Sequence, residues 1–287
     1  MKRSILILPI LLSLLASCGN SSSGKIKIAC SFAPIYDFAK RIAGDNAEIM
    51  NIVGDAEPHE FQLVEARKMA FIESSDAFFT YGHGIDPWAS GLNKTSECDI
   101  TKGIEFLSSN GEEDPHAWLS FELDKKMMRT VADKLSDLDP SNAAIYQANL
   151  QKAETDFSAL QTRYETELNV SSPFLVTSHE AFGYLAHDFG LTQIGIGDLA
   201  DHEPSSSRLK EIVDLIQKEG IRYIFLEELD SPGYVQAVVN ELKKNNYEVE
   251  YRELSCYECV SDGDYQKGQD FLHVMEENLE VLKTCLN

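Results

Sequence analysis

Basic side chains are scarce in this chain. Its 287 residues include 25 lysines and arginines against 47 aspartates and glutamates, which gives a formal net charge of −22. Two of the basic residues, Lys2 and Arg3, lie in an N-terminal leader, so the remainder is more negative still. Nucleic-acid-binding proteins need clustered positive charge to neutralise phosphates, and we therefore expect no nucleic-acid partner.

Sequence signatures of common enzyme classes are also missing. The chain has no Gly-x-Ser-x-Gly nucleophile elbow and no Walker phosphate loop. His59-Glu60 and His179-Glu180 resemble the start of a zinc-protease helix, but positions 63 and 183 are leucine and glycine instead of the second histidine. We expect that the protein is not an enzyme, and a zinc-dependent hydrolase is the less favoured alternative.

An apolar run lies at the N-terminus. After Lys2 and Arg3 come the apolar residues 5–15 and the string LASC, which ends at Cys18. This run is too short for a stable membrane span and has the form of a secretory signal. Its ending resembles the bacterial lipoprotein box, which predicts a signal peptide over 1–17, lipidation of Cys18 and a flexible tether over 18–24. The protein should be exported and anchored to a membrane by lipid.

Five cysteines remain after Cys18. Export permits disulfides, but an odd number leaves at least one thiol outside intrachain pairs. Cys256 and Cys259 form a Cys-x-x-Cys string with Tyr-Glu as spacers, which fits a redox motif poorly, and no second pair completes a four-sulfur metal site. A structural role is expected for them, with one bonded to Cys285. The other two cysteines are Cys30 and Cys98.

Two series of alternating strands and helices divide the chain. The first predicts strands at 25–30, 47–53 and 76–81, with helices at 34–43, 64–74 and 121–138. An Asp-Pro-Ser-Asn turn then precedes residues 142–168, which contain no glycine or proline and repeat apolar side chains at helical spacing. At 1.5 Å per residue this helix is about 40 Å long, so we expect it to span two lobes.

The second series begins after this helix. It predicts strands at 174–177, 192–196, 223–227 and 248–254 and helices at 181–189, 205–219, 234–245 and 265–285. Alternation of this kind is typical of parallel sheets. The predicted fold is α/β, with two lobes that are each a mainly parallel sheet flanked by helices. The expected boundaries are 25–139 for the N-terminal lobe, 140–168 for the rigid linker helix and 169–287 for the C-terminal lobe.

Three histidines stand in similar short strings. His59 and His116 follow prolines in EPHEF and DPHAWL, and His179 follows the predicted strand 174–177 in TSHEAFGY. Proline stiffens a loop, and the carboxyl end of a parallel strand is where open α/β sheets place ligands. Three neutral imidazoles leave one further coordination position and suit zinc. Because two histidines come from the first lobe and one from the second, we predict one divalent cation between the lobes.

In this order the motifs resemble the zinc/manganese solute-binding proteins of bacterial metal ABC importers, in particular the periplasmic zinc-uptake lipoproteins of cluster A-I. Four further strings carry the resemblance: SFAPIYD at 31–37, DPSN at 139–142 with Tyr146 and Asn149, EPS at 203–205, and IFLE at 224–227. It covers nearly all of the chain after the tether. It implies two α/β lobes on a rigid helix, one bound metal ion, delivery to a membrane permease, and a monomer.

Carried over residue by residue, the resemblance places His59, His116 and His179 at three metal positions. Members with histidine at the third position are typically zinc proteins, whereas manganese members tend to have glutamate there. A neutral nitrogen is softer than a carboxylate, so Zn²⁺ is favoured over Mn²⁺. The fourth position falls near 254–258, where Glu258, Cys256 and water are all candidates. A metal-binding surface adhesin is the alternative function within this family.

The chain departs from many zinc members of the family just before the second metal position. Those members carry a long histidine-rich loop there, whereas residues 110–113 are short, acidic and free of histidine. Trp118 and Phe182 are expected to pack around the site and orient its imidazoles. His83 and His202 are candidates for approaching the cleft. His187 and His273 are expected to be structural or exposed.

Overall fold

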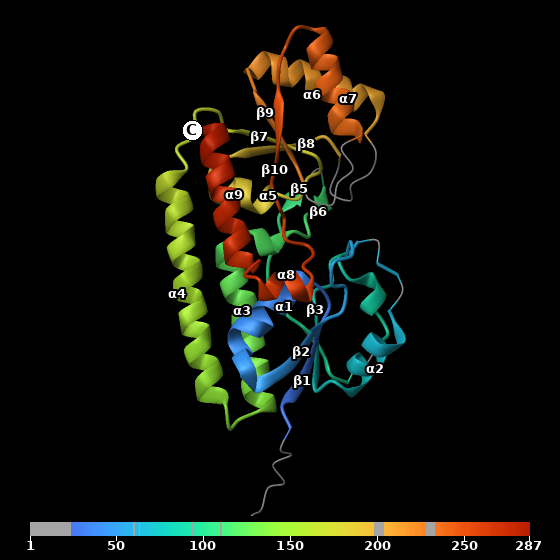
Figure 1. Ribbon diagram of the computed structural model, residues 1–287, viewed down its shortest axis with the longest axis vertical. Coiled ribbons are helices and arrows are strands. Elements are labelled where there is room, and N and C mark those ends of the chain that lie inside the picture. The colour runs from blue at the N-terminus through green and yellow to red at the C-terminus, as the bar shows by residue number, and fades with distance from the viewer. Residues whose placement is uncertain are drawn as a thin grey trace, which may run out of the picture.

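The computed structural model describes residues 24–59, 61–62, 64–92, 95–109, 111–197, 204–227 and 233–287. It has two lobes, each built on a four-stranded parallel sheet, with a layer of long helices along one side of both (Figure 1). The predicted α/β fold is confirmed. No helix in these ranges is both long and apolar enough to cross a membrane. The predicted signal peptide, Cys18 and His202 lie outside the described residues.

The first sheet lies between two helical layers. Strand alternation sends Ile28 and Cys30 of its central strand into the main core, whereas Ala29 faces a smaller cluster that includes Phe71 and Phe78. Helix α1 packs on the main-core side and α2 supplies Phe71 on the other. The strand order is β2-β1-β3-β4. The elements are β1 (Ile26–Cys30), α1 (Ala33–Ala43), β2 (Ala47–Asn51), α2 (Ala66–Ser74), β3 (Ala77–Thr80) and β4 (Glu97–Asp99).

The second sheet repeats this construction. Leu175 and Phe225 point into the main core, and Val176 and Ile224 point into a separate cluster under α6 and α7. The strand order is β10-β9-β7-β8, with every neighbouring pair parallel. The elements are β7 (Phe174–Thr177), α5 (Gly183–Asp188), β8 (Thr192–Gly195), α6 (Ser206–Glu219), β9 (Tyr223–Leu226), α7 (Gly233–Lys244) and β10 (Glu250–Glu253).

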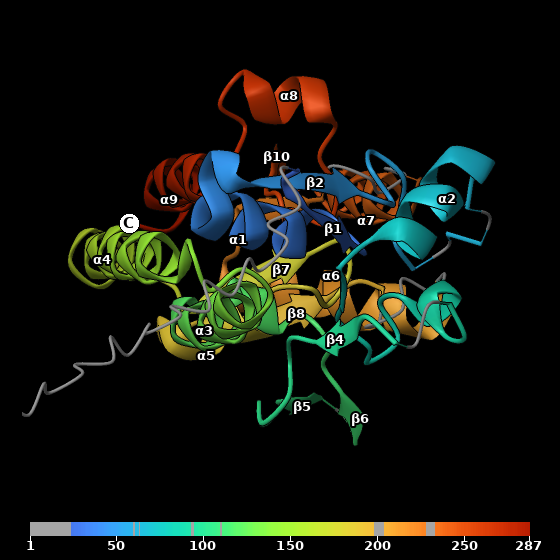
Figure 2. The ribbon, with the colours of Figure 1, turned by 90° about the horizontal axis from the view of Figure 1, so that it is seen from below.

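The long helices connect the lobes. Helix α4 (Ala143–Glu167) has the extent that the sequence predicts, and it packs against α1, α3 (Phe121–Leu138) and α9 (Phe271–Leu286) (Figure 2). Its Asn149 side chain donates to the Ile42 carbonyl at 2.9 Å, and its Tyr164 hydroxyl donates to the Met275 carbonyl at 2.6 Å. A two-stranded hairpin, β5 (Ser108–Ser109) and β6 (Glu112–Glu113), precedes the second histidine motif.

The predicted single helix over 265–285 is wrong. The chain forms α8 (Asp262–Gln266), a turn and then α9. Gly268 in that turn has φ 98°, a conformation that glycine adopts without steric cost. The Asp270 side chain then caps α9 by accepting from the His273 amide at 3.0 Å.

After β10 the chain returns to the first lobe before it enters α9. The Val260 amide donates to the Gly54 carbonyl at 3.1 Å, and the Asn51 side chain donates to the Val260 carbonyl at 3.2 Å. Helix α8 consequently lies beside α1, where the rings of Tyr36 and Tyr265 have centroids 5.1 Å apart (Figure 1). Helix α9 then runs back to the second lobe, where the Ser171 amide donates to the Leu286 carbonyl at 2.7 Å. The lobes are therefore joined by more than the single helix expected from the sequence.

The expected disulfide between Cys285 and Cys256 or Cys259 is wrong, because Cys285 is a free thiol. Asn278 of α9 contacts Ser255, next to Cys256, and Cys285 follows it by two helical turns. Two turns separate residues by about 10 Å along the axis, whereas the Cα atoms of a disulfide usually lie within about 7 Å.

Candidate metal centre

The three predicted histidines form a row where the two lobes meet. The ring centroids of His59 and His116 lie 5.8 Å apart, and those of His116 and His179 lie 5.5 Å apart. His116, in the middle, is fully buried, His179 is buried, and the His59 side chain is 25 % exposed. The structure thus brings together side chains that are separated by up to 120 positions in the chain.

Glu258 joins this row and is buried. Its Oε1 lies 3.4 Å from Nε2 of His116 and 3.6 Å from Nε2 of His59. Among the described residues, these three buried atoms have no hydrogen-bond partner. Native structures satisfy nearly all buried polar atoms, so three that converge without hydrogen bonds fit a group of metal donors. Their ligand atoms lie within 4.8 Å of one another.

His179 belongs to a second group, which shares Glu258. The ligand atoms of His179, Glu227 and Glu258 also lie within 4.8 Å of one another, and Nδ1 of His179 is 2.6 Å from Oε2 of Glu227. Glu258 is thus the carboxylate common to both groups. Cys256, its rival from the sequence, instead donates a hydrogen bond from Sγ to Glu227.

Glu227 is the residue that the sequence did not single out. It ends the string IFLE, directly after β9, and β9 pairs with β7, which precedes His179. Polar side chains that follow two neighbouring parallel strands meet at one edge of the sheet. A glutamate directly after an apolar strand was the available sign of a site residue. Recognising it required knowledge of the order of the strands in the sheet.

Asp114 orients His116. Its Oδ1 accepts a hydrogen bond from the His116 amide at 3.0 Å and lies 2.8 Å from the ring Nδ1, which leaves Nε2 toward Glu258. Trp118 lies against the imidazole edge with ring centroids 5.2 Å apart. A Cβ atom added to Gly183 would lie closer to Asp114 Oδ2 than the 3.0 Å that real Cβ atoms respect. The glycine of the TSHEAFGY string thus makes room for the residue that orients the second histidine.

The loop that carries Glu258 is clamped. Asn278 of α9 accepts from the Ser255 amide at 3.1 Å and donates to the Ser255 carbonyl at 2.7 Å. The Trp118 indole donates to the Cys256 carbonyl at 2.7 Å. Tyr257 has φ 59°, which is uncommon for a residue with a side chain and is sustained only where surrounding contacts impose it. These contacts fix the direction of Glu258.

The imidazoles and carboxylates shift one another's pKa values. Burial by itself raises the pKa of Glu258, but the facing His116 and His59 imidazoles hold it well below its usual value. Burial by itself lowers the pKa of His116, but Asp114 and Glu258 raise it. Burial, and then the nearby Glu258 carboxylate, raise the pKa of Glu57 to about 8. The site is therefore a dense set of buried groups whose charges affect one another.

Three other histidines within the described ranges, His83, His187 and His273, do not join this row. His83 pairs through Nδ1 with Glu113 and stacks on Phe106, with ring centroids 3.8 Å apart. His187 is exposed and His273 is half-buried, and both lie on helices beside acidic neighbours. Phe182 is buried in the main core, as is Trp118.

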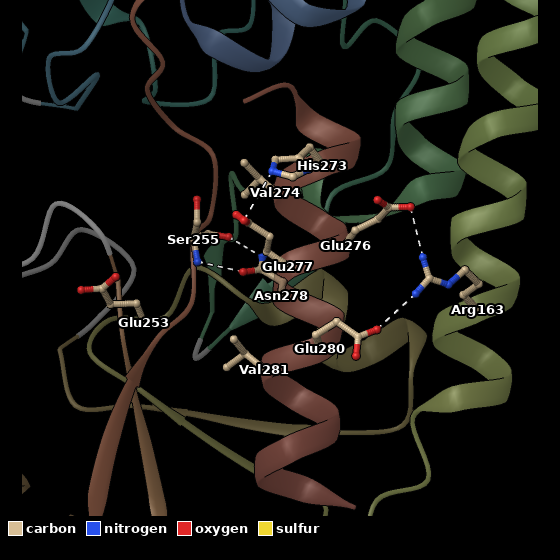
Figure 3. A pocket seen from close by; sticks show the side chains of 10 residues that line it. All are labelled: Arg163, Glu253, Ser255, His273, Val274, Glu276, Glu277, Asn278, Glu280 and Val281. Atoms are coloured by element: carbon tan, nitrogen blue, oxygen red, sulfur yellow. Dashed lines mark hydrogen bonds and ion pairs between the residues drawn. The ribbon is translucent and has the colours of Figure 1, made fainter. Parts of the chain in front are cut away.

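The large cavity in Figure 3 is not a metal centre. It has a volume of about 610 Å³ and lies between α9 and the residues after β10. Two of its carboxylates, Glu276 and Glu280, point toward Arg163 and pair with it at 3.1 and 3.2 Å. Its one histidine is His273. Across the described ranges, groups of three or more metal donors occur at the histidine row alone.

Two α/β lobes connected by long helices, with imidazoles and carboxylates gathered where the lobes meet, define a two-lobed solute-binding protein of the metal type. Comparison with known sequences agrees. The chain belongs to the family described as zinc-uptake complex component A, periplasmic, which matches residues 28–285.

Individual relatives are similar over most of the chain. The zinc-binding lipoprotein AdcA of Streptococcus pneumoniae is 33 % identical over 99 % of this chain, and the high-affinity zinc uptake system protein ZnuA of Bacillus subtilis is 27 % identical over 95 % of it. The chain spans 61 % of the length of AdcA and 94 % of that of ZnuA.

Solved structures show the same fold. The Zn(II)-bound ZnuA-like domain of S. pneumoniae AdcA superposes with a TM-score of 0.76 at 31 % identity, covering 92 % of this chain and 99 % of that domain. The laminin-binding protein Lmb of Streptococcus agalactiae superposes with a TM-score of 0.82 at 27 % identity, covering 92 % of this chain and all of that one.

Proposed function

We propose that this protein captures one Zn²⁺ ion between its lobes and delivers it to the permease of an ABC importer. His59, His116, His179 and Glu258 are the proposed ligands. The observation that carries the proposal is the convergence of buried Nε2 and Oε1 atoms that make no hydrogen bonds among the described residues. Three nitrogens and one carboxylate suit zinc better than manganese, which prefers oxygen ligands.

The relatives support zinc as the cargo and export as the setting. Several are named zinc-binding or zinc-uptake proteins, and AdcA is named a lipoprotein. We propose the same for this chain, with Cys18 as the lipidated residue, a membrane-anchored mature protein and a monomer as the working unit. No catalytic role is proposed, because the ligand set serves binding and release.

Calorimetric titration of metal-free protein tests the cargo. We expect one zinc ion per chain and weaker binding of manganese. His116→Ala should lose most of the affinity, whereas His187→Ala removes an exposed imidazole outside the row and should bind zinc as the unaltered protein does. A stoichiometry of zero, or a preference for manganese, would contradict the proposal.

Lipidation is tested in cells. The unaltered protein should be processed and found in the membrane fraction, whereas Cys18→Ser should stay unprocessed or appear as a soluble form. Normal acylated, membrane-bound Cys18→Ser protein would contradict this part of the proposal.

A second function, surface adhesion, is favoured by one likeness. Lmb is described as a bifunctional protein with adhesin and metal-transporting activity. We propose laminin as the first ligand to test, with immobilised laminin and protein in the zinc-loaded and zinc-free forms. Failure of both forms to bind laminin would leave metal capture as the proposed function and remove adhesion to this ligand.

A further inference from the structure

A tyrosine hydroxyl from the second lobe is inserted at the base of the β5–β6 hairpin. The two strands are antiparallel, with Ser109 opposite Glu112. Continuation of this register places Leu107 opposite Asp114, and such a pair normally exchanges two backbone hydrogen bonds. One of the two is present, because the Asp114 amide donates to the Leu107 carbonyl at 2.9 Å. The Leu107 amide points the other way along the same pair and meets the hydroxyl of Tyr184.

The Tyr184 hydroxyl bridges the second half of this pair. It accepts from the Leu107 amide at 2.8 Å and donates to the Asp114 carbonyl at 3.0 Å. A phenolic hydroxyl both donates and accepts, so one group satisfies both backbone partners. The side chain is buried, and burial raises the pKa of Tyr184, so the hydroxyl keeps its proton and remains a donor.

The bridge acts on the residue that orients the central imidazole. Asp114 Oδ1 accepts from the His116 amide at 3.0 Å and lies 2.8 Å from the ring Nδ1. A shift of the Asp114 backbone would move this carboxylate relative to the imidazole. Helix α5 meets Asp114 at a second point, because Gly183, the residue before Tyr184, leaves the space that Asp114 Oδ2 occupies. The start of α5 therefore sets both the backbone and the side chain of Asp114.

The first lobe holds the other side of the same segment. The Tyr81 hydroxyl donates to the Pro115 carbonyl at 2.7 Å and accepts from the Ala117 amide at 3.2 Å. The segment that carries His116 thus lies between two buried tyrosine hydroxyls, one from each lobe. Loss of the Tyr184 contact alone would leave the segment attached to the first lobe.

We propose that Tyr184 is a positioning residue for zinc binding, which makes the orientation of the central imidazole depend on contact between the lobes. Without the hydroxyl, Leu107 and Asp114 complete their direct hydrogen bond, and the Asp114 carboxylate is drawn away from His116. This inference rests on the proposed function, because it concerns how the same site holds its ion.

A pair of tyrosine variants tests the role of the hydroxyl. Tyr184→Phe removes it and leaves the ring in place. Tyr164→Phe is the matched control, because it also removes a buried hydroxyl that donates to a carbonyl, here that of Met275 between α4 and α9. Zinc dissociation constants are measured by competition with a chromogenic chelator. Groups that orient metal-binding histidines change affinity by about 10- to 100-fold, and we expect about 3- to 10-fold weaker zinc binding one contact further out, in Tyr184→Phe. Tyr164→Phe should bind zinc as the unaltered protein does.

Two further measurements separate positioning from simple structural support. In a His116→Ala background, Tyr184→Phe should cause no additional loss of zinc affinity, because the imidazole that it positions is gone. In crystals of metal-free Tyr184→Phe, the Leu107 amide should donate directly to the Asp114 carbonyl, and Asp114 Oδ1 should lie farther from His116 Nδ1 than the present 2.8 Å.

Two other substitutions at the same position complete the test. Tyr184→4-aminophenylalanine restores a donor toward the Asp114 carbonyl and should recover most of the zinc affinity. If Tyr184→Phe does not fold, Tyr184→Met replaces it, because the flexible methionine side chain fills irregular gaps in a core. It also lacks the hydroxyl and should show the same weaker zinc binding.

The inference is overturned if the unaltered protein binds zinc and the variants without the hydroxyl bind it equally well. A loss that persists in full in the His116→Ala background would also overturn it, since the hydroxyl would then act on the site by another route. Absence of zinc binding by the unaltered protein is a different result, which removes the proposed function itself.

Discussion

The two lobes contribute unequally to the metal centre. His59, His116 and Glu258 form one compact group, and the loop that carries Glu258 precedes residues that pack on the first lobe. The second lobe adds His179 with its supporting carboxylate, Glu227. With the proposed ligands this gives a division of roles, in which the first lobe presents a nearly complete chelating group and the second lobe supplies the ligand that completes it.

The same two regions are much more alike in their packing. In both sheets, one face enters the main core and the other faces a separate apolar cluster. The main core contains Phe38 and Trp118 of the first lobe together with Phe182 and Phe225 of the second. Polar contacts cross between the lobes as well, because the Tyr184 hydroxyl accepts from the Leu107 amide at 2.8 Å. The lobes therefore share one interior although they differ in the ligands they supply.

The largest expected effect is stabilisation by zinc, because the ligands come from both lobes. At a thousandfold excess of free zinc over Kd, binding should stabilise the folded protein by about 4 kcal/mol. The radius of gyration should change little, because the shared core and three crossings of the chain resist hinge motion. Thermal unfolding and small-angle scattering, each with and without zinc, check this. An unchanged melting temperature would contradict the interlobe site, and a large change in radius would contradict the rigid junction.

The next prediction compares the contributions of the two lobes to zinc affinity. His116→Ala should weaken zinc binding by about 100- to 1000-fold, because it disrupts the compact first-lobe group, whereas His179→Ala should cost about tenfold, since water can replace a completing ligand. Chelator competition gives both dissociation constants, and unfolding curves verify that both variants fold. Equal losses, or a larger loss for His179→Ala, would reverse the division of roles.

A smaller effect is expected from the contact between the lobes at Gly183. In Gly183→Ala the new Cβ would press on Asp114, which cannot retreat without releasing His116. We expect about tenfold weaker zinc binding, equivalent to about 1.4 kcal/mol. Gly190→Ala is a control for replacing a glycine in the same region, because its added Cβ has nothing within 4 Å, although its φ of 70° strains the backbone. If only Gly190→Ala lowers zinc affinity, the Asp114 explanation fails.

The smallest effect concerns a carboxylate in the shared interior. Asp124 is fully buried, and its oxygens have no hydrogen-bond partner among the described residues. Burial, and then Asp37 of the first lobe and Asp188 of the second, raise its pKa well above the usual value. The folded state therefore keeps a proton that the unfolded state releases, and stability falls as pH rises above about 4.

Asp124→Asn tests this by removing the titrating group. The free energy of unfolding of the unaltered protein should fall with pH by at most about 1.4 kcal/mol per pH unit because of Asp124, and the variant should lack this fall. At pH 7 to 8 the variant should therefore be more stable than the unaltered protein. Denaturant unfolding between pH 4 and pH 8 measures the slope. Parallel pH profiles for the two proteins would show that Asp124 is not protonated in the folded state.

Local patterns were sufficient to predict most helices and strands. Helix α4 follows from an uninterrupted apolar period and its preceding turn, and β7 from a short apolar run. The split between α8 and α9 was not predictable in the same way, because an isolated glycine such as Gly268 is tolerated within many helices. Its φ of 98° is visible only in the folded chain.

The three histidines were predictable because each has its own local string. That Glu258 faces His59 and His116 while Cys256 contacts Glu227 was not predictable, since both lie in one loop and only its conformation separates them. That conformation is imposed by Asn278 and Trp118, which are distant in sequence. Predicting that Glu227 lies near His179 required knowledge that β9 lies beside β7. What the sequence left open was therefore set by contacts between distant segments.

The return of the chain to the first lobe has a consequence for the order of folding during export. Residues 254–270 complete the first lobe, and α9 covers the main core, yet both follow the whole second lobe in sequence. A chain that emerges from its N-terminus cannot finish the first lobe until the second has also emerged. The lobes must consequently mature together, and a nascent chain that lacks its last fifty residues would hold His59 and His116 without the carboxylate that completes their group.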